Sequence, residues 1–280
     1  MGCTTSTVQA QIDVGEHTVA EVCSVLDSGD LLFVAGDNQV VRWATWSDWT
    51  HVLLVVRTDD GHACGLEAVR CADGSLDLLT GQRRAGARLV ALNERLHCAG
   101  VALGRGVLRL CIVKLYCTDD ERRLVRRRLL EFAEDVRAVP YERNWWSMVR
   151  AQFASLLGPN AHDTSSYFCS EIVAEGIARA GIVRSDAIVS SCITPRMLLE
   201  AGHTWRADEY ALGRYGDEQV TLGALTLGGG GRAGGHAAPR PPAASAPGAR
   251  TWRLSSAAAA AAPPDVAPPY DYLDADDLFL

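Results

Sequence analysis

The sequence contains a cysteine, a histidine and a glutamate whose positions suit nucleophilic catalysis. Cys169 begins an apolar stretch of helical period, and a thiol in the first turn of a helix lies at the positive end of the helix dipole, which favours the reactive thiolate. His51 stands at the start of a buried-strand pattern, WTHVLLVV, which would hold its ring rigidly. Glu67, in a second short strand, could orient the imidazole and stabilise its charged form. These residues are the candidate nucleophile, base and orienting carboxylate.

A predicted hairpin brings the glutamate towards the histidine. Strand patterns at 52–57 and 63–70 are joined by the segment TDDG at 58–61, whose Asp-Gly pair is typical of an antiparallel turn. Further strands are expected at 30–36, 76–79, 87–92, 107–115 and 219–227, with another apolar segment at 40–46. The sequence therefore predicts a mostly antiparallel sheet in which Glu67 lies near His51.

Apolar spacing predicts several helices. In the cysteine helix Ile172, Val173 and Ile177 share one face with Cys169, so we expect the thiol to face the sheet. Other helices are expected at 18–26, at 119–136, at 145–157 and after the Thr-Pro pair at 194–195. The arginine-rich face of helix 119–136 could lie on anionic lipid, or it could be a solvated face balanced by nearby acids, which we favour. The expected fold class is α+β, with a small sheet packed against the helix that carries the nucleophile.

Composition limits the class of protein. The 280 residues are 48% hydrophobic, enough for a sizeable core, and the net charge of -7 argues against a general nucleic-acid binder. The most apolar stretch, 98–117, is interrupted by charged residues, so we expect strands in a soluble core there and no membrane span. Nine cysteines at irregular spacing, without an export signal, indicate reduced thiols and a cytoplasmic location. No Cys-x-x-Cys or His-x-x-x-His spacing is present, so no metal and no cofactor is predicted.

Both ends of the chain differ from its body, which we expect to be one domain at 18–227. Residues 1–17 form a flexible start in which Gly2 fits a myristate acceptor and Cys3 could take a palmitate; the alternative is an unmodified terminus. Acylation would anchor the protein to cytoplasmic membrane faces. Residues 228–280 are of low complexity and are expected to be disordered. Their acidic-aromatic end, 270–280, could fold against a protein partner or serve only as a solubilising terminus.

The tryptophans before the candidate base have two interpretations. Trp43, Trp46 and Trp49 recur at every third residue and could form a substrate rim or enter a membrane interface. Large aromatic side chains near a sheet edge are usually buried, so we favour a role in core packing.

Four segments carry a resemblance to a known family. The segments GDLLF (29–33), WTHV (49–52), LEA (66–68) and YFCSEIVA (167–174) resemble the circularly permuted NlpC-type papain-like hydrolases, specifically the YaeF/YiiX-like amidase group. The resemblance covers about residues 28–199, and its distinguishing mark is that the histidine strand precedes the cysteine helix. It implies a permuted papain-like fold with Cys169 as nucleophile, His51 as base and Glu67 as the residue that orients the base. It implies nothing about the two ends.

The chemistry expected of these groups is acyl transfer to a thiol. His51 would take the thiol proton, and the sulfur would attack a carbonyl to give an acyl-enzyme. The backbone N–H of Cys169 is a candidate oxyanion donor, and Tyr167 is a candidate second one. The substrate would be an amide or, through the same intermediate, an ester or thioester, lipid-linked or peptidic. The alternatives are a lipid acyltransferase of the same superfamily and an inactive papain-like binding module.

Overall fold

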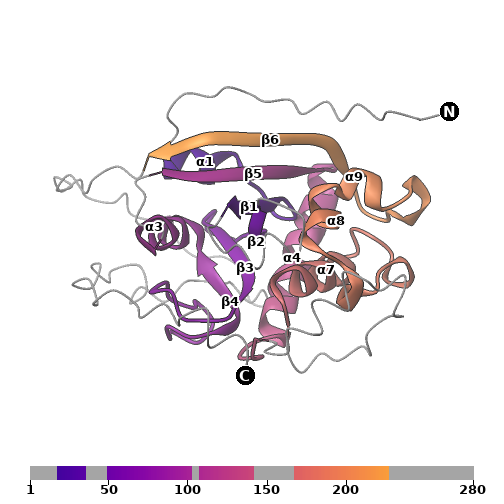
Figure 1. The fold of residues 1–280 in the computed structure, drawn as a ribbon. Coiled ribbons are helices and arrows are strands. Elements are labelled where there is room, and N and C mark those ends of the chain that lie inside the picture. The colour runs from indigo at the N-terminus through magenta and orange to yellow at the C-terminus, as the bar shows by residue number, and fades with distance from the viewer. Residues whose placement is uncertain (1–17, 36–48, 103–106, 142–166, 227–280) are drawn as a thin grey trace, which may run out of the picture.

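The computed structural model describes residues 18–35, 49–102, 107–141 and 167–226 (Figure 1). Several sequence predictions therefore lie outside the described residues: the segments at 40–46 and 145–157, the flexible start with Gly2 and Cys3, and the tail from 228. Trp43 and Trp46 also lie outside.

A six-stranded antiparallel sheet forms the centre of the fold. Its strands lie in the order β4-β3-β2-β1-β5-β6, and each neighbouring pair is antiparallel. The strands are β1 (Leu31–Ala35), β2 (Trp49–Arg57), β3 (Ala63–Val69), β4 (Gly86–Ala91), β5 (Val107–Tyr116) and β6 (Arg214–Thr226). The last of the described strands, β6, pairs with β5, and near its beginning the buried Tyr215 hydroxyl donates a 2.9 Å hydrogen bond to the carbonyl of Gly29.

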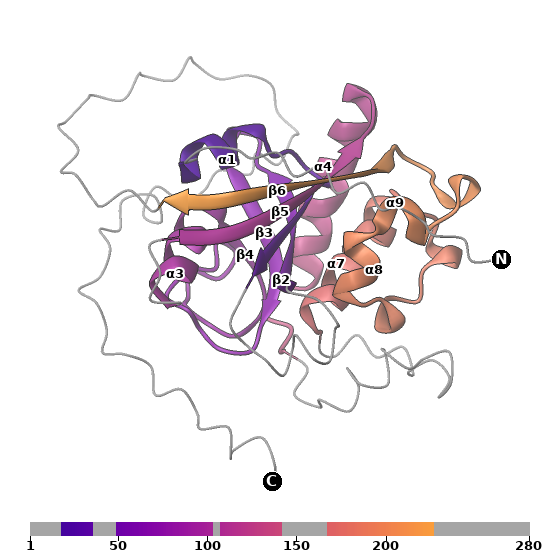
Figure 2. The ribbon, with the colours of Figure 1, turned by 45° about the horizontal axis from the view of Figure 1, so that its top comes forward.

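Helices cover both faces of the sheet (Figures 1 and 2). The helices are α1 (Val19–Val25), α3 (Leu92–Ala102), α4 (Asp119–Asp135), α7 (Cys169–Ala180), α8 (Pro195–Leu199) and α9 (Ala201–Thr204). Successive strand residues point to opposite faces, so Leu31 and Phe33 pack with α4, α7 and α8, whereas Leu32 and Val34 pack with α1 and α3. The predicted α+β class with a small antiparallel sheet is confirmed.

The predicted hairpin is present. Strands β2 and β3 pair with Leu54 opposite Leu66, and the Gly61 amide donates to the Thr58 carbonyl at 3.0 Å. Gly61 has a φ of +86°, which side chains disfavour, so the turn requires glycine there. The hairpin fixes the register that sets which residues of β3 lie beside β2.

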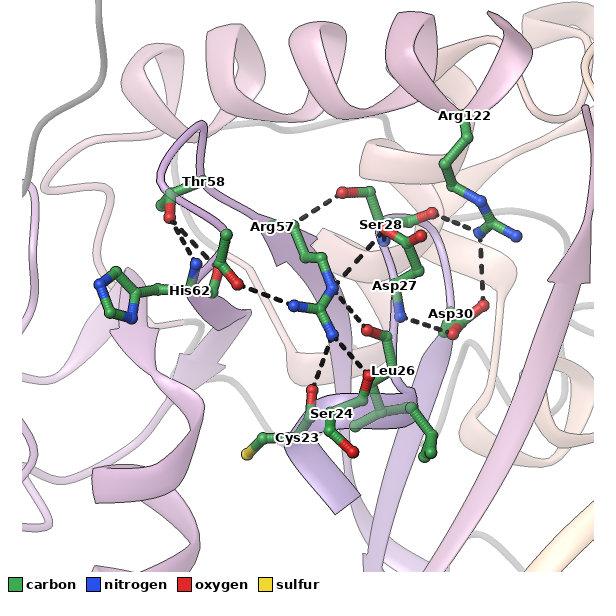
Figure 3. A network of polar contacts seen from close by, with 12 residues as sticks. Cys23, Ser24, Leu26, Asp27, Ser28, Asp30, Arg57, Thr58, His62 and Arg122 are labelled. Atoms are coloured by element: carbon green, nitrogen blue, oxygen red, sulfur yellow. Dashed lines mark hydrogen bonds and ion pairs between the residues drawn. The ribbon is translucent and has the colours of Figure 1, made fainter. Parts of the chain in front are cut away.

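Two polar side chains fasten helices to the sheet (Figure 3). Arg57, at the end of β2, donates to the carbonyl oxygens of Cys23 at 2.9 Å and Leu26 at 2.8 Å, at the C-terminal end of α1. Cations are favourable at this end of a helix because the last carbonyls lack intrahelical partners. The fully buried Asp30 contacts the guanidinium of Arg122 on α4 at 3.4 Å. Both ties lie close to the start of β1.

Two sequence predictions about secondary structure were wrong, and a third element is present but begins earlier than expected. Residues 76–79 do not form a strand, because Asp77 makes only isolated bridges to Gln82 and Val90. Residues 92–102 form helix α3, where strands were expected from 98 onward. This helix follows β4 without a glycine or proline between them, so no local stop signal marks its start. The last strand begins at Arg214, five residues before the expected start at 219.

Candidate active site

Cys169 is the first residue of α7, as the sequence predicted. The helix is fixed by its apolar face, on which Ile172 and Ile177 are fully buried, and its C-terminus is closed by Gly181 in the left-handed conformation. At its N-terminus the Glu171 carboxylate accepts the backbone N–H of Phe168 at 3.3 Å. Cys169 is only partly buried. A rigid helix therefore presents a partly accessible thiol at its positive end.

His51 lies between the thiol and a carboxylate. It is the third residue of β2, paired with Val34 of β1, and its Nε2 lies 2.5 Å from Oε2 of Glu67. The ring also forms a hydrogen bond with the Cys169 side chain, which leaves Nδ1 for the sulfur. Burial alone would lower the pKa of His51, but the hydrogen bonds and charges of Cys169 and Glu67 outweigh it and raise that pKa to about 9. The imidazole therefore holds its proton at neutral pH.

Glu67 is fully buried and bound on both oxygens. Its Oε1 accepts from Nη2 of Arg88 at 2.6 Å and from Nε of Arg95 at 2.9 Å, while Oε2 faces His51. Burial disfavours the charged form, but Arg95, Arg88 and His51 outweigh it and hold the pKa of Glu67 well below its usual range. The carboxylate is therefore ionised next to the imidazole.

Two arginines and an aspartate around Glu67 were not predicted as part of the site. Arg88 lies directly opposite Glu67 in the β3–β4 register, and Arg95 reaches it from α3. Asp73 accepts from Nη2 of Arg88 at 2.7 Å and lies 3.1 Å from Nε of Arg95. The signal that could have found them is Arg88 itself, which interrupts the otherwise apolar strand GARLVA and is fully buried.

Tyr167 occupies a structural position just before α7. Its ring is buried in the core, and burial raises the pKa of its phenol to about 12. Its backbone N–H donates to the Pro140 carbonyl at 3.2 Å, in a segment that forms a parallel bridge with Tyr141. This amide is therefore occupied, and the predicted role of Tyr167 as an oxyanion donor stays a prediction.

The other candidate features of the site have different outcomes. Trp49 is buried in the core and has the guanidinium of Arg109 5.7 Å from its ring centroid, so core packing is its role in this structure. Among the described residues, no group of three or more His, Cys, Asp or Glu side chains is arranged to hold a metal ion. No helix in the described ranges is both long enough and apolar enough to span a bilayer.

Comparison with known proteins gives a weak likeness. No family model matches the chain, and no curated protein matches it. Among solved structures it is similar to a metalloprotein, YiiX from Escherichia coli O157:H7, with 13% sequence identity and a TM-score of 0.39 over 71% of this chain and 97% of that chain. A likeness at this level says nothing about activity.

Proposed function

We propose that this protein is a cysteine-dependent hydrolase that cleaves an amide bond through an acyl-enzyme intermediate. The observation that carries the proposal is that one imidazole, from His51, bonds both the thiol of Cys169 and the buried carboxylate of Glu67. A nucleophile, a base and a residue that orients the base are the groups that such a reaction needs.

In the proposed reaction His51 holds the proton that Cys169 gives up, so the nucleophile is a thiolate. The thiolate of Cys169 attacks the substrate carbonyl and forms a carbon–sulfur bond, while the carbonyl oxygen takes the negative charge and accepts from the Cys169 backbone N–H. The imidazolium of His51 then gives its proton to the departing amine, and the carbon–nitrogen bond breaks. In the second step His51 takes a proton from water, the hydroxide attacks the acyl carbon, and the sulfur leaves as thiolate. Glu67 stays ionised and holds the imidazolium in place.

The fold proposed for this site is the permuted papain-like, NlpC-type fold of the YaeF/YiiX-like group. Three features support it: the chain order of His51, Glu67 and Cys169, the antiparallel sheet, and the packing of the cysteine helix on that sheet. The same intermediate would serve ester or thioester substrates. It would also serve acyl transfer, in which a lipid or protein nucleophile takes the place of water.

The location and partners of the protein are also proposals. Acylation of Gly2 and Cys3 would hold the protein at cytoplasmic membrane faces and bring lipid-linked substrates within reach of the thiol. The acidic-aromatic segment 270–280 would provide a separate site for a protein partner.

The test is capture of the acyl-enzyme. The full chain is incubated with a panel of peptidyl and fatty-acyl p-nitrophenyl esters and aminocoumarin amides, and intact-mass spectrometry follows the added acyl group. We expect one acyl group on the wild type and none on Cys169→Ala or on His51→Gln. Cys117→Ala, at a partly buried thiol of another segment, is the matched control and should acylate normally. Acylation that persists in Cys169→Ala, or no acylation of any variant by any probe, would overturn the proposal in favour of a binding module.

A further inference from the structure

The side chains behind Glu67 form a closed ionic cluster that the proposed reaction does not itself use. We propose that Arg88, Arg95 and Asp73 are positioning residues: the two arginines fix the Glu67 carboxylate, and Asp73 cancels the charge that they bring towards His51. The inference rests on the proposed function for its catalytic meaning, but its physical content is the ionisation of His51.

The arginines remove the rotational freedom of the carboxylate. Arg88 donates to Oε1 of Glu67 through Nε at 2.9 Å and through Nη2 at 2.6 Å. Arg95 lies across both oxygens, with its Nε 2.9 Å from Oε1 and 3.0 Å from Oε2. Because one guanidinium comes from β4 and the other from α3, the carboxylate is held from two directions. Its Oε2 is thereby aimed at Nε2 of His51.

Such a double contact has an electrostatic disadvantage that Asp73 offsets. Two guanidiniums beside one carboxylate leave one excess positive charge, which disfavours a third cation at His51. Asp73 contacts both arginines, at 2.7 Å and 3.1 Å, so two cations face two anions and the cluster has no net charge. Burial alone would raise the pKa of Asp73, but the charges of Arg95 and Arg88 and the hydrogen bond from Arg88 outweigh it and hold that pKa below its usual range, so Asp73 is ionised.

The groups that face this cluster come from every element packed around it. His51 is on β2, Glu67 on β3, Arg88 on β4, Arg95 on α3 and the thiol that bonds His51 on α7. The thiol of Cys98, also on α3, lies within the electrostatic influence of Asp73 and is kept protonated mainly by its own burial, which raises its pKa. Asp73 is therefore the member whose charge can be removed without breaking a contact to Glu67 or His51.

The inference predicts shifts of opposite sign in the titration of His51. The full chain is labelled with ¹⁵N-histidine, and the signal of His51, one of seven histidines, is assigned by its loss in His51→Gln. Asp73→Asn leaves an excess cation and should lower the midpoint by about half a pH unit or more. Arg95→Gln leaves an excess anion and should raise it, and Arg95→Lys should return it towards the wild-type value because the charge is restored.

The matched control is Asp77→Asn. Asp77 is a buried aspartate in the same part of the chain and pairs with Arg84 at 2.9 Å, outside the cluster. The Asp77→Asn substitution should shift the titration midpoint of His51 less than Asp73→Asn does, although both substitutions remove one negative charge. If Asp73→Asn does not fold, the Arg95→Gln and Arg95→Lys pair decides the question.

Two results would overturn the inference: shifts of the same sign in Asp73→Asn and Arg95→Gln, as general loosening of the site would give, or equal shifts in Asp73→Asn and Asp77→Asn. The titration needs no substrate. If no probe acylates the protein but the opposite shifts are observed, the proposed function fails and the positioning cluster stands.

Discussion

Replacing Glu67 by Gln is expected to destabilise the protein strongly, because the positive charges of the cluster then exceed its negative charges. Glutamine keeps the volume of the side chain and one acceptor oxygen, but the fully buried site loses the negative charge that faces Arg88, Arg95 and His51. Removing one partner of a buried ion pair costs about 3–5 kcal/mol. Since Asp73 keeps its contacts to both arginines, we expect a loss at the lower end, about 3 kcal/mol.

The pH range of this loss follows from the pKa of Glu67, which is depressed in the folded protein. A depressed carboxyl pKa gives a stabilisation that is fully present above the unfolded value, near 4.5, and is lost as the pH falls towards the folded value. The difference between wild type and Glu67→Gln should therefore be constant between about pH 5 and pH 6 and should shrink in acid.

Urea unfolding followed by circular dichroism measures this difference, provided that both proteins give the same m-value. The control is Glu131→Gln, at an exposed position on α4, where we expect a change within about 0.5 kcal/mol. A loss below about 1 kcal/mol in Glu67→Gln, or one no larger than that of the control, would refute the reasoning that the cluster is electrostatically closed.

Three further predictions concern the thiol, the packing of its helix and the histidine. Iodoacetamide at neutral pH should label Cys169 faster than Cys64, because burial raises the pKa of the Cys64 thiol to about 12. Peptide mass spectrometry measures the extent of labelling at each cysteine, and equal labelling of the two would contradict the prediction. Gly176→Val should destabilise by about 1–3 kcal/mol in thermal melts, because a Cβ there would lie 2.7 Å from Leu54 Cδ2; an unchanged melting temperature contradicts it. The raised pKa of His51 gives a stabilisation that is complete below about pH 6.5 and is lost as the pH rises through about 9. His51→Gln should therefore reduce the free energy of unfolding by up to about 3 kcal/mol relative to wild type at pH 6 and by little at pH 10, as measured by urea unfolding.

The parts of the fold that the sequence predicted correctly depend on short-range signals. The turn before β3 contains an Asp-Gly pair. Helix α4, which was predicted from its apolar spacing, is also capped locally: the Thr118 side chain accepts from the amide of Glu121, and the Glu121 carboxylate accepts from the amide of Thr118. The Thr194-Pro195 pair begins α8 in the same local way. In each case the residues that decide the structure lie within four positions of one another, so they are visible without the fold.

The parts that were missed depend on contacts that no local pattern contains. Arg88 lies 21 residues after Glu67 in the chain, and Arg95 lies 28 residues after it. The contact of Arg88 with Glu67 requires the β3–β4 register that places these two residues opposite each other. A one-residue shift of that register would turn Arg88 to the other face of the sheet. The placement of Cys169 beside His51 depends in turn on how α7 packs on the sheet. The sequence therefore predicted the types of residue at the site, whereas the ionic cluster required the structure.

The position of β6 determines when this protein can finish folding during its synthesis. Strand β5 pairs with β6 on its outer side, but the ribosome makes residues 117–213 before it makes the first residue of β6. Until then the nascent chain exposes an unpaired β5 edge, the kind of surface on which strands of other molecules can add. Pairings between segments far apart in sequence also slow folding, and the Tyr215–Gly29 contact spans 186 residues. A chain that stops before residue 214 thus keeps every residue of the candidate active site but leaves that edge open to aggregation.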